Sequence, residues 1–355
     1  DMMIFTYKAS MAGPYHNDNN LPCQDACAIK TGNDEVKVFA VADGLGSELY
    51  SDIGSSVAVE TAVNYCAEHI TRDMSYIDIK KIMNNAMVYA YKAVLTKAAE
   101  DGNDSDEYDT TLCMAVYDGE HLYFAQSGDS GMVALLQNGE YFRVTTQQRD
   151  EEGHVFPLCW GPEKWEFGCV EKPVSAVMIM TDGVFEQICP PLMKKKEVDI
   201  NIPLARKFMD RFDCDEENIE DLEKAAYEYL KNYPRQSLDD DKTVIVLVNT
   251  ERKPEKKDET YYAIPDWKSL REEAEKKLTA YNELQHDEKD TDEVIELVSD
   301  DAELNDVDSE NISFALKDNT SAESKELDIL IGCEVEEEAT FTSDDKKKEM
   351  YFDEQ

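Results

Sequence analysis

The chain has 355 residues, of which 42% are hydrophobic, so it can bury a substantial core in one large domain or two ordinary ones. Its 78 acidic and 36 basic side chains leave a formal net charge of −42 at pH 7. This charge argues against nucleic acid and anionic membrane surfaces as partners. It favours a basic protein, a basic substrate or a divalent cation.

The nine cysteines are dispersed and include no Cys-x-x-Cys pair, which is typical of reduced thiols in a cytoplasmic protein. No apolar run reaches the length of a transmembrane helix, and the first residues lack the regions of a signal peptide. We therefore expect a cytoplasmic monomer without membrane contact.

Near the start of the chain, short apolar runs alternate with turn residues, which predicts strands. The expected strands are 3–10, 25–31 and the run that ends at Asp43, with a loop rich in Gly, Pro and Asn between the first two. From Ser51 the apolar residues recur at helical spacing. This spacing predicts one helix from Ser51 to about 66 and a second over about 77–99.

Residues 110–147 predict an antiparallel meander. Asp118-Gly119 and Asn138-Gly139 are strong hairpin signals between the expected strands 111–117, 121–127, 131–137 and 141–145. Residues 147–173 show no periodicity and are either a packed long loop or a flap over a site. The remaining expected elements are a strand over 177–181, helices at about 201–213 and 217–232, and a strand over 243–249.

The composition changes after Thr250. Residues 251–355 contain 34 acidic and 14 basic side chains, roughly twice the negative charge density of the preceding part. This difference predicts a folded domain over 1–250 and an acidic C-terminal extension over 251–355. Within the extension, the sequence of residues 267–284 predicts one amphipathic helix. The acidic runs beyond this helix favour disorder.

Four stretches share one pattern, in which a strand-like run meets an Asp beside Gly, Ser or Thr. They contain Asp43, Asp129, Asp182 and the run 239–241. Each stretch alone is more often an ordinary turn, but four of them at strand ends indicate a common site. Oxygen ligands of this kind suit Mg²⁺ and Mn²⁺. Two such ions about 3.5–4 Å apart activate water and neutralise phosphate oxygens, so the pattern predicts metal-dependent phosphate hydrolysis.

The order of these segments resembles the metal-dependent serine/threonine protein phosphatases of type 2C, in particular a bacterial branch. The matching motifs span about residues 3–250 and are Gln24-Asp25-Ala26, Asp43-Gly44-Leu45-Gly46, Thr110-Thr111, Gly128-Asp129-Ser130, Thr181-Asp182-Gly183 and Asp240-Asp241-Lys242-Thr243. Any one motif is weak, whereas six in this order are specific. The resemblance implies an α+β fold, a four-layer αββα sandwich of two antiparallel sheets flanked by helices, with the metals at one end.

The resemblance also implies roles for individual residues. Asp43 bridges two Mn²⁺ or Mg²⁺ ions, the Gly44 carbonyl binds one of them, and Asp182 and Asp240 bind the other. Asp25 holds metal-bound water.

The resemblance further implies a third, weaker ion at Asp129 with Asp182. It implies that Thr110 and Thr111 shape the sheet beside the site.

This chain departs from the family pattern at several positions. Leu45 stands where many members have a His that protonates the leaving group, and no Arg precedes Asp25 to bind the phosphate. His16 is the natural substitute for that Arg; otherwise it is an ordinary loop residue. Gly131 stands where an Arg usually follows Gly-Asp-Ser, which weakens the third-ion assignment. Asp241 could exchange roles with Asp240.

The resulting prediction is a protein serine/threonine phosphatase that acts by in-line attack of a metal-bridging hydroxide. Its expected partners are a phosphoprotein substrate and a cognate Ser/Thr kinase. A catalytically silent, partner-binding phosphatase-like domain is the alternative. The acidic extension is expected to cover the site or to recruit a basic partner.

Overall fold

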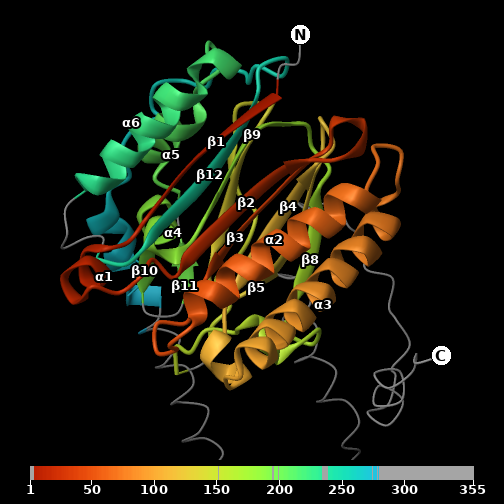
Figure 1. The fold of residues 1–355 in the computed structure, drawn as a ribbon. Coiled ribbons are helices and arrows are strands. Elements are labelled where there is room, and N and C mark those ends of the chain that lie inside the picture. Colours follow the sequence, from red (N-terminus) through yellow and green to blue (C-terminus); the bar gives the residue numbers. More distant parts are fainter. Residues whose placement is uncertain are drawn as a thin grey trace, which may run out of the picture. The chain divides into compact units, whose positions relative to one another are not determined.

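The computed structural model describes residues 4–150, 152–193, 196–198, 200–233, 239–273, 275–277 and 279, and for 191–198 the backbone alone. All of these residues belong to the first of the chain's two units, Asp1–Asn305. Two five-stranded antiparallel sheets form the framework of this unit (Figure 1). These sheets and their flanking helices confirm the predicted α+β class.

The first sheet has the strand order β2-β3-β4-β5-β8. Its strands are β2 (Asp25–Thr31), β3 (Lys37–Asp43), β4 (Leu112–Tyr117), β5 (Leu122–Ser127) and β8 (Glu166–Val170). Every residue of β4 and β5 is buried, and all of them except Gln126 and Ser127 are hydrophobic, so both faces of these strands are covered.

The second sheet has the strand order β1-β12-β9-β6-β7. Its strands are β1 (Ile4–Met11), β12 (Lys242–Asn249), β9 (Val174–Met180), β6 (Gly131–Leu136) and β7 (Tyr141–Arg143). The first and last strands of the domain are therefore neighbours, in register from Ile4 opposite Asn249 to Met11 opposite Lys242.

A shared apolar core joins the two sheets. It contains Phe39, Tyr117 and Leu122 from the first sheet with Ile179 and Leu247 from the second, all fully or almost fully buried. Because the core residues come from strands far apart in the sequence, the two sheets stabilise each other and hold their strand ends in fixed positions.

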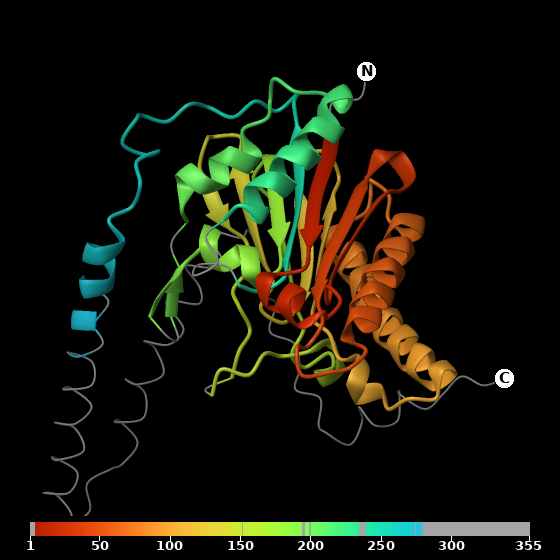
Figure 2. The ribbon, with the colours of Figure 1, turned by 60° about the vertical axis from the view of Figure 1, so that its left-hand side comes forward.

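Helices cover the outer faces of both sheets (Figure 2). Helices α2 (Ser51–His69) and α3 (Tyr76–Asp101) pack on the first sheet. On the second sheet, α4 (Asp182–Ile188), α5 (Ile202–Met209) and α6 (Ile219–Lys231) share a second core with β1, β9 and β12. The remaining elements are α1 (Pro14–Asn19), the hairpin of β10 (Pro191–Met193) and β11 (Lys196–Val198), and the 3₁₀ turns Asn33–Glu35, Ser105–Tyr108, Leu158–Trp160 and Glu216–Asn218.

The predicted meander over 110–147 is wrong in its topology. Both hairpins form, but β5 and β6 lie in different sheets, so the chain crosses between sheets at Gly128-Asp129-Ser130. Gly128 has a φ of +116°, a conformation that glycine adopts without strain. Local pairing signals could not reveal this crossing, because the choice of sheet depends on β9, which pairs with β6 from far along the chain.

Several elements were also absent from the sequence prediction. They are α1, in the expected loop; β8, in the segment expected to be irregular; and α4 and the β10–β11 hairpin, after the strand β9. All are short, and short elements depend on tertiary contacts more than on periodicity.

The first described residues of the acidic extension form hydrogen bonds with the folded domain. Glu255 N donates a hydrogen bond to Gln137 O, and the Tyr261 hydroxyl accepts one of 2.7 Å from Tyr141 N. Residues 267–273 and 275–277 are helical, within the predicted helix 267–284. The predicted disorder beyond it lies outside the described residues. Among the described helices, each is either too short or too polar to span a bilayer.

We expect the substitution Gly131→Ala to destabilise the domain by about 1–3 kcal/mol, because overpacking of a dense core costs this much. A Cβ atom at Gly131 would lie 2.1 Å from the Phe185 ring. The matched control is Gly46→Ala, whose added Cβ would meet its nearest neighbour at 3.8 Å. Urea unfolding measures both, and equal stabilities of the two variants would contradict the packing described.

Candidate metal centre

Five acidic residues converge at one end of the two sheets. Pairing of β2 with β3 places Asp25 directly opposite Asp43. Asp182 follows the end of β9, Asp240 precedes the start of β12, and Asp129 lies at the crossing from β5 to β6. Carboxylate oxygens of Asp43, Asp129 and Asp182 all lie within 4.8 Å of one another, a spacing that could hold a metal ion.

Two threonines hold the backbone of Asp43. The Thr111 hydroxyl accepts a hydrogen bond of 2.9 Å from Asp43 N, and the Asp43 carbonyl accepts bonds from Thr111 N (2.8 Å) and the Thr110 hydroxyl (3.0 Å). The next residue, Gly44, packs so closely on α2 that a Cβ would lie 2.6 Å from the carbonyl oxygen of Ser51. Coordination by the Gly44 carbonyl stays a prediction.

A hydrogen bond between the two sheets fixes Asp25. The Thr181 hydroxyl, at the end of β9, donates a bond of 2.7 Å to Asp25 Oδ2. The same hydroxyl accepts a bond of 3.2 Å from Thr243 N on β12. Asp25 is thus oriented by the opposite sheet, which suits a residue that positions water beside a metal.

The environments of Asp240 and Asp241 differ. Asp241 is buried, and its two carboxylate oxygens accept bonds from Gly13 N (2.7 Å), His16 Nδ1 (2.7 Å) and Gln24 N (2.6 Å). Asp240 instead lines a cavity of about 370 Å³ together with Asp182. The geometry therefore favours Asp240 over Asp241 as the ligand, because the Asp241 oxygens are already engaged.

His16 lies in α1 and is hydrogen-bonded to Asp241. It is only 6% exposed, and its Nδ1 atom makes the bond to Asp241. Its expected contact with phosphate stays a prediction, and the observed bond makes it an anchor of the connection between β1 and β2.

Two further residues at the acidic group, Arg149 and Glu186, were not predicted from the sequence. Arg149 Nη2 lies 2.7 Å from Asp129 Oδ2, 3.3 Å from Asp182 Oδ2 and 3.2 Å from Glu186 Oε1. Arg149 is the single Arg in the aperiodic stretch 147–173, and this is the one signal that could have singled it out. Glu186 follows Asp182 by one helical turn, but α4 was not predicted.

Mutual repulsion and burial disfavour the charged forms of these carboxyl groups. Burial, then the charges of Asp25 and Asp182, raise the pKa of Asp43 well above its usual value. Burial raises the pKa of Asp25 to about 8; the Thr181 hydrogen bond opposes the rise and the charge of Asp241 adds to it. The pKa of Asp182 is raised well above its usual value by burial and by Asp129.

A divalent cation fits this donor set. Asp129 Oδ1 is buried and has no hydrogen-bond partner among the described residues, although it belongs to the group with Asp43 and Asp182. A hard cation between these oxygens supplies the missing partner and offsets the repulsion. The candidate ligands for two ions are therefore Asp43, Asp182 and Asp240, with Asp129 Oδ1 beside them.

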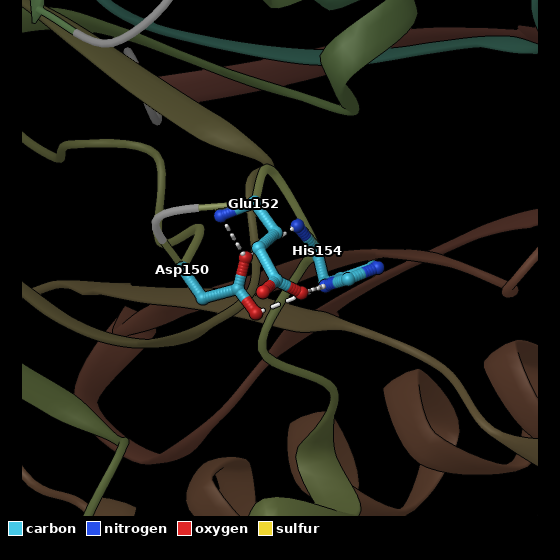
Figure 3. A group of neighbouring side chains, drawn as sticks. All are labelled: Asp150, Glu152 and His154. Carbon is cyan, nitrogen blue, oxygen red and sulfur yellow. Dashed lines mark hydrogen bonds and ion pairs between the residues drawn. The ribbon is translucent and has the colours of Figure 1, made fainter.

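A second acidic group, formed by Asp150, Glu152 and His154, lies on an exposed turn (Figure 3). His154 Nδ1 is 3.0 Å from Asp150 Oδ2, and Asp150 Oδ1 accepts bonds from the backbone N atoms of Glu152 and His154, each 2.8 Å long. These contacts are those of a self-capped turn, and they point to no ligand.

We expect the stability of the metal-free protein to fall as the pH rises from about 4 to 8. The raised pKa values mean that the folded chain binds more protons than the unfolded chain, in which Asp titrates near about 3.9, so deprotonation favours unfolding. After chelation, the thermal midpoint should be at least about 4 °C lower at pH 8 than at pH 5.5. Millimolar Mn²⁺ should raise the thermal midpoint by more at pH 8 than at pH 5.5.

The control for this experiment is Asp43→Asn, which removes one repelling carboxylate and should flatten the pH dependence. A thermal midpoint that rises between these two pH values in the chelated wild type would contradict the buried, mutually repelling arrangement.

Comparisons with known proteins found one curated relative. Serine/threonine-protein phosphatase 3 of Escherichia coli (strain K12) is 27% identical over 142 residues, which are 39% of this chain and 55% of that protein. The chain thus spans about half the length of this curated relative.

Solved structures were also matched. Stp1 of Staphylococcus aureus aligns with 15% identity over 70% of this chain and 95% of that chain, with a TM-score of 0.47. The catalytic domain of PstP in complex with 2 manganese ions aligns with 14% identity over 69% of this chain and 97% of that chain, with a TM-score of 0.46.

The family match extends over most of the described domain. The profile described as "Protein phosphatase 2C" matches residues 12–231, which include Asp25, Asp43, Asp129 and Asp182. The chain therefore belongs to the protein phosphatase 2C family.

Proposed function

We propose that this protein is a Mn²⁺- or Mg²⁺-dependent phosphatase that hydrolyses phosphoserine and phosphothreonine in proteins. The observation that carries the proposal is the group formed by buried Asp129 and half-buried Asp43 and Asp182, whose oxygens lie within 4.8 Å of one another in a chain of this family. An isolated set of buried carboxylates is costly, and a divalent cation is the common way to retain it.

The roles of the residues follow from their positions. Asp43 faces Asp25 across a strand pair, and its carboxylate lies within 4.8 Å of that of Asp182, so Asp43, Asp182, Asp240 and the Gly44 carbonyl are the residues that would hold two ions. Two divalent ions there would supply an activated water and would neutralise the phosphate oxygens. Asp25, held by the Thr181 hydroxyl, is the proposed residue for orienting water towards phosphorus.

No acid for the leaving group follows from the arrangement of residues. Leu45 has no titratable proton, and His16 is bonded to Asp241. We propose that solvent protonates the departing alkoxide. The acidity of the cavity beside the centre, which Asp182, Glu186 and Asp240 line, suits substrates with basic side chains near the phosphorylated residue.

A phosphoprotein substrate and its Ser/Thr kinase are the proposed functional partners of the domain. The acidic extension is the proposed contact for a basic partner, and a monomer without nucleic-acid or membrane partners fits the charge of −42. The alternative is a silent binding domain. The reason to consider a silent binding domain is that the chain lacks the Arg that many family members have before Asp25 and the His that they have at the position of Leu45.

We expect Asp43→Asn to lower Mn²⁺-dependent hydrolysis of p-nitrophenyl phosphate by more than about 100-fold, since the loss of residues outside the ligand sphere already costs about 10–100-fold. The matched control is Asp34→Asn. Asp34 is exposed and has a φ of 49°, which Asn tolerates, so this variant should keep wild-type activity. An inactive wild type with Mn²⁺ would instead support the silent domain.

We expect truncation after residue 279 to change the rate on basic phosphopeptides but not on p-nitrophenyl phosphate. The cut keeps the contacts of Tyr261 and of Tyr262, whose ring lies 4.3 Å from the Arg206 guanidinium carbon. The experiment compares full-length and truncated protein on a basic and an acidic phosphopeptide. Equal rates on every substrate would refute a role for the extension in substrate recruitment or site covering.

A further inference from the structure

Arg149 provides a positive charge inside the candidate metal centre. Its Nε and Nη2 atoms lie 3.0 and 2.7 Å from Asp129 Oδ2, and Nη2 also approaches Asp182 Oδ2 (3.3 Å) and Glu186 Oε1 (3.2 Å). Three carboxylates from two separate parts of the chain therefore meet at one guanidinium nitrogen. Such convergence of acidic oxygens is the usual surrounding of a bound cation.

The backbone beside Arg149 is fixed next to Asp129. Gln148 N donates a bond of 3.0 Å to Gly128 O, and Gly128 N donates one of 2.8 Å to Gln148 Oε1. Gln147 Nε2 donates a bond of 3.2 Å to Asp129 O. Arg149 also pairs with Val155 in a short antiparallel bridge. The backbone at Arg149 is thus fixed beside Asp129, and its partly exposed side chain (35%) is held by the ion pairs with Asp129, Asp182 and Glu186.

The position of this guanidinium conflicts with a third metal ion. The family resemblance places that ion at Asp129 and Asp182, at about 2.0–2.1 Å from the ligand oxygens if it is Mg²⁺. Arg149 contacts Oδ2 of both residues, and its fixed charge repels a further cation there. The other Asp129 oxygen, Oδ1, has no hydrogen-bond partner among the described residues and remains available to the first two ions.

Most of the negative charge at the site is offset without a third ion. Two divalent ions and one guanidinium carry five positive charges, against the six carboxylates of Asp25, Asp43, Asp129, Asp182, Glu186 and Asp240. We propose that Arg149 takes the place of the third ion, so that the centre binds two divalent ions and one built-in cation. This inference rests on the two-ion centre of the proposed function.

The test counts bound Mn²⁺ per chain by equilibrium dialysis of the full-length protein. Arg149→Gln is compared with Arg72→Gln, a control at an exposed position that removes the same charge and keeps the same acidic extension. We expect Arg149→Gln to bind about one ion more than the control at millimolar Mn²⁺, because the repelling charge has gone. Arg149→Met, which keeps the aliphatic stem, should do the same.

A double variant locates the additional ion. In Arg149→Gln with Asp129→Asn the extra Mn²⁺ should be lost. Equal ion counts in both Arg149 variants and in the Arg72→Gln control would overturn the inference, as would a wild type that binds three ions at the centre. A variant that only raises KM, with an unchanged ion count, would also overturn it and would make Arg149 a phosphate ligand.

The ion count tests the role of Arg149 separately from the proposed phosphatase activity. A wild type that binds two ions without hydrolysing phosphate refutes the function and leaves the inference standing. Normal hydrolysis together with an unchanged ion count in the Arg149 variants refutes the inference alone.

Discussion

The domain has to hold several carboxylates close together although their charges repel one another. Asp25 and Asp43 face each other across one pair of strands, and Asp182 and Asp129 approach from the other sheet and from the crossing between the sheets. Burial is the first cause of the raised pKa values of Asp25, Asp43 and Asp182, and the neighbouring carboxylates add to the rise. The opposing force is the core between the sheets, which fixes the strand ends regardless of the charges placed on them.

The connections at this end of the domain contribute residues to the site, as the strands do. The turn at Gly128-Asp129-Ser130 moves the chain from one sheet to the other and delivers Asp129 at the same point. The segment that follows β7 returns to this turn through Gln148 and brings Arg149 with it. Asp129 and Arg149 therefore come from connecting segments, whereas Asp25 and Asp43 come from paired strands.

The positions of the main strands and the acidic residues could be predicted because both depend on local patterns. A buried strand that ends in Asp-Gly is recognisable from neighbouring residues, and β2, β3 and β12 begin or end within about a residue of the prediction. The exchange of sheets between β5 and β6 could not be predicted in the same way, because it depends on distant partners. Arg149 was missed for a similar reason: nothing in its own neighbourhood shows that it reaches Asp129 and Asp182.

The sequence by itself determined the α+β class, the order of the acidic motifs and the family, since short runs of apolar and turn residues encode each of them. Tertiary structure alone distinguished the environments of Asp240 and Asp241, through the three donors that engage the Asp241 carboxylate. It also decided that a guanidinium lies beside Asp129. Both outcomes depend on distances between segments more than a dozen residues apart, and such distances are set by how the two sheets pack and not by any local preference.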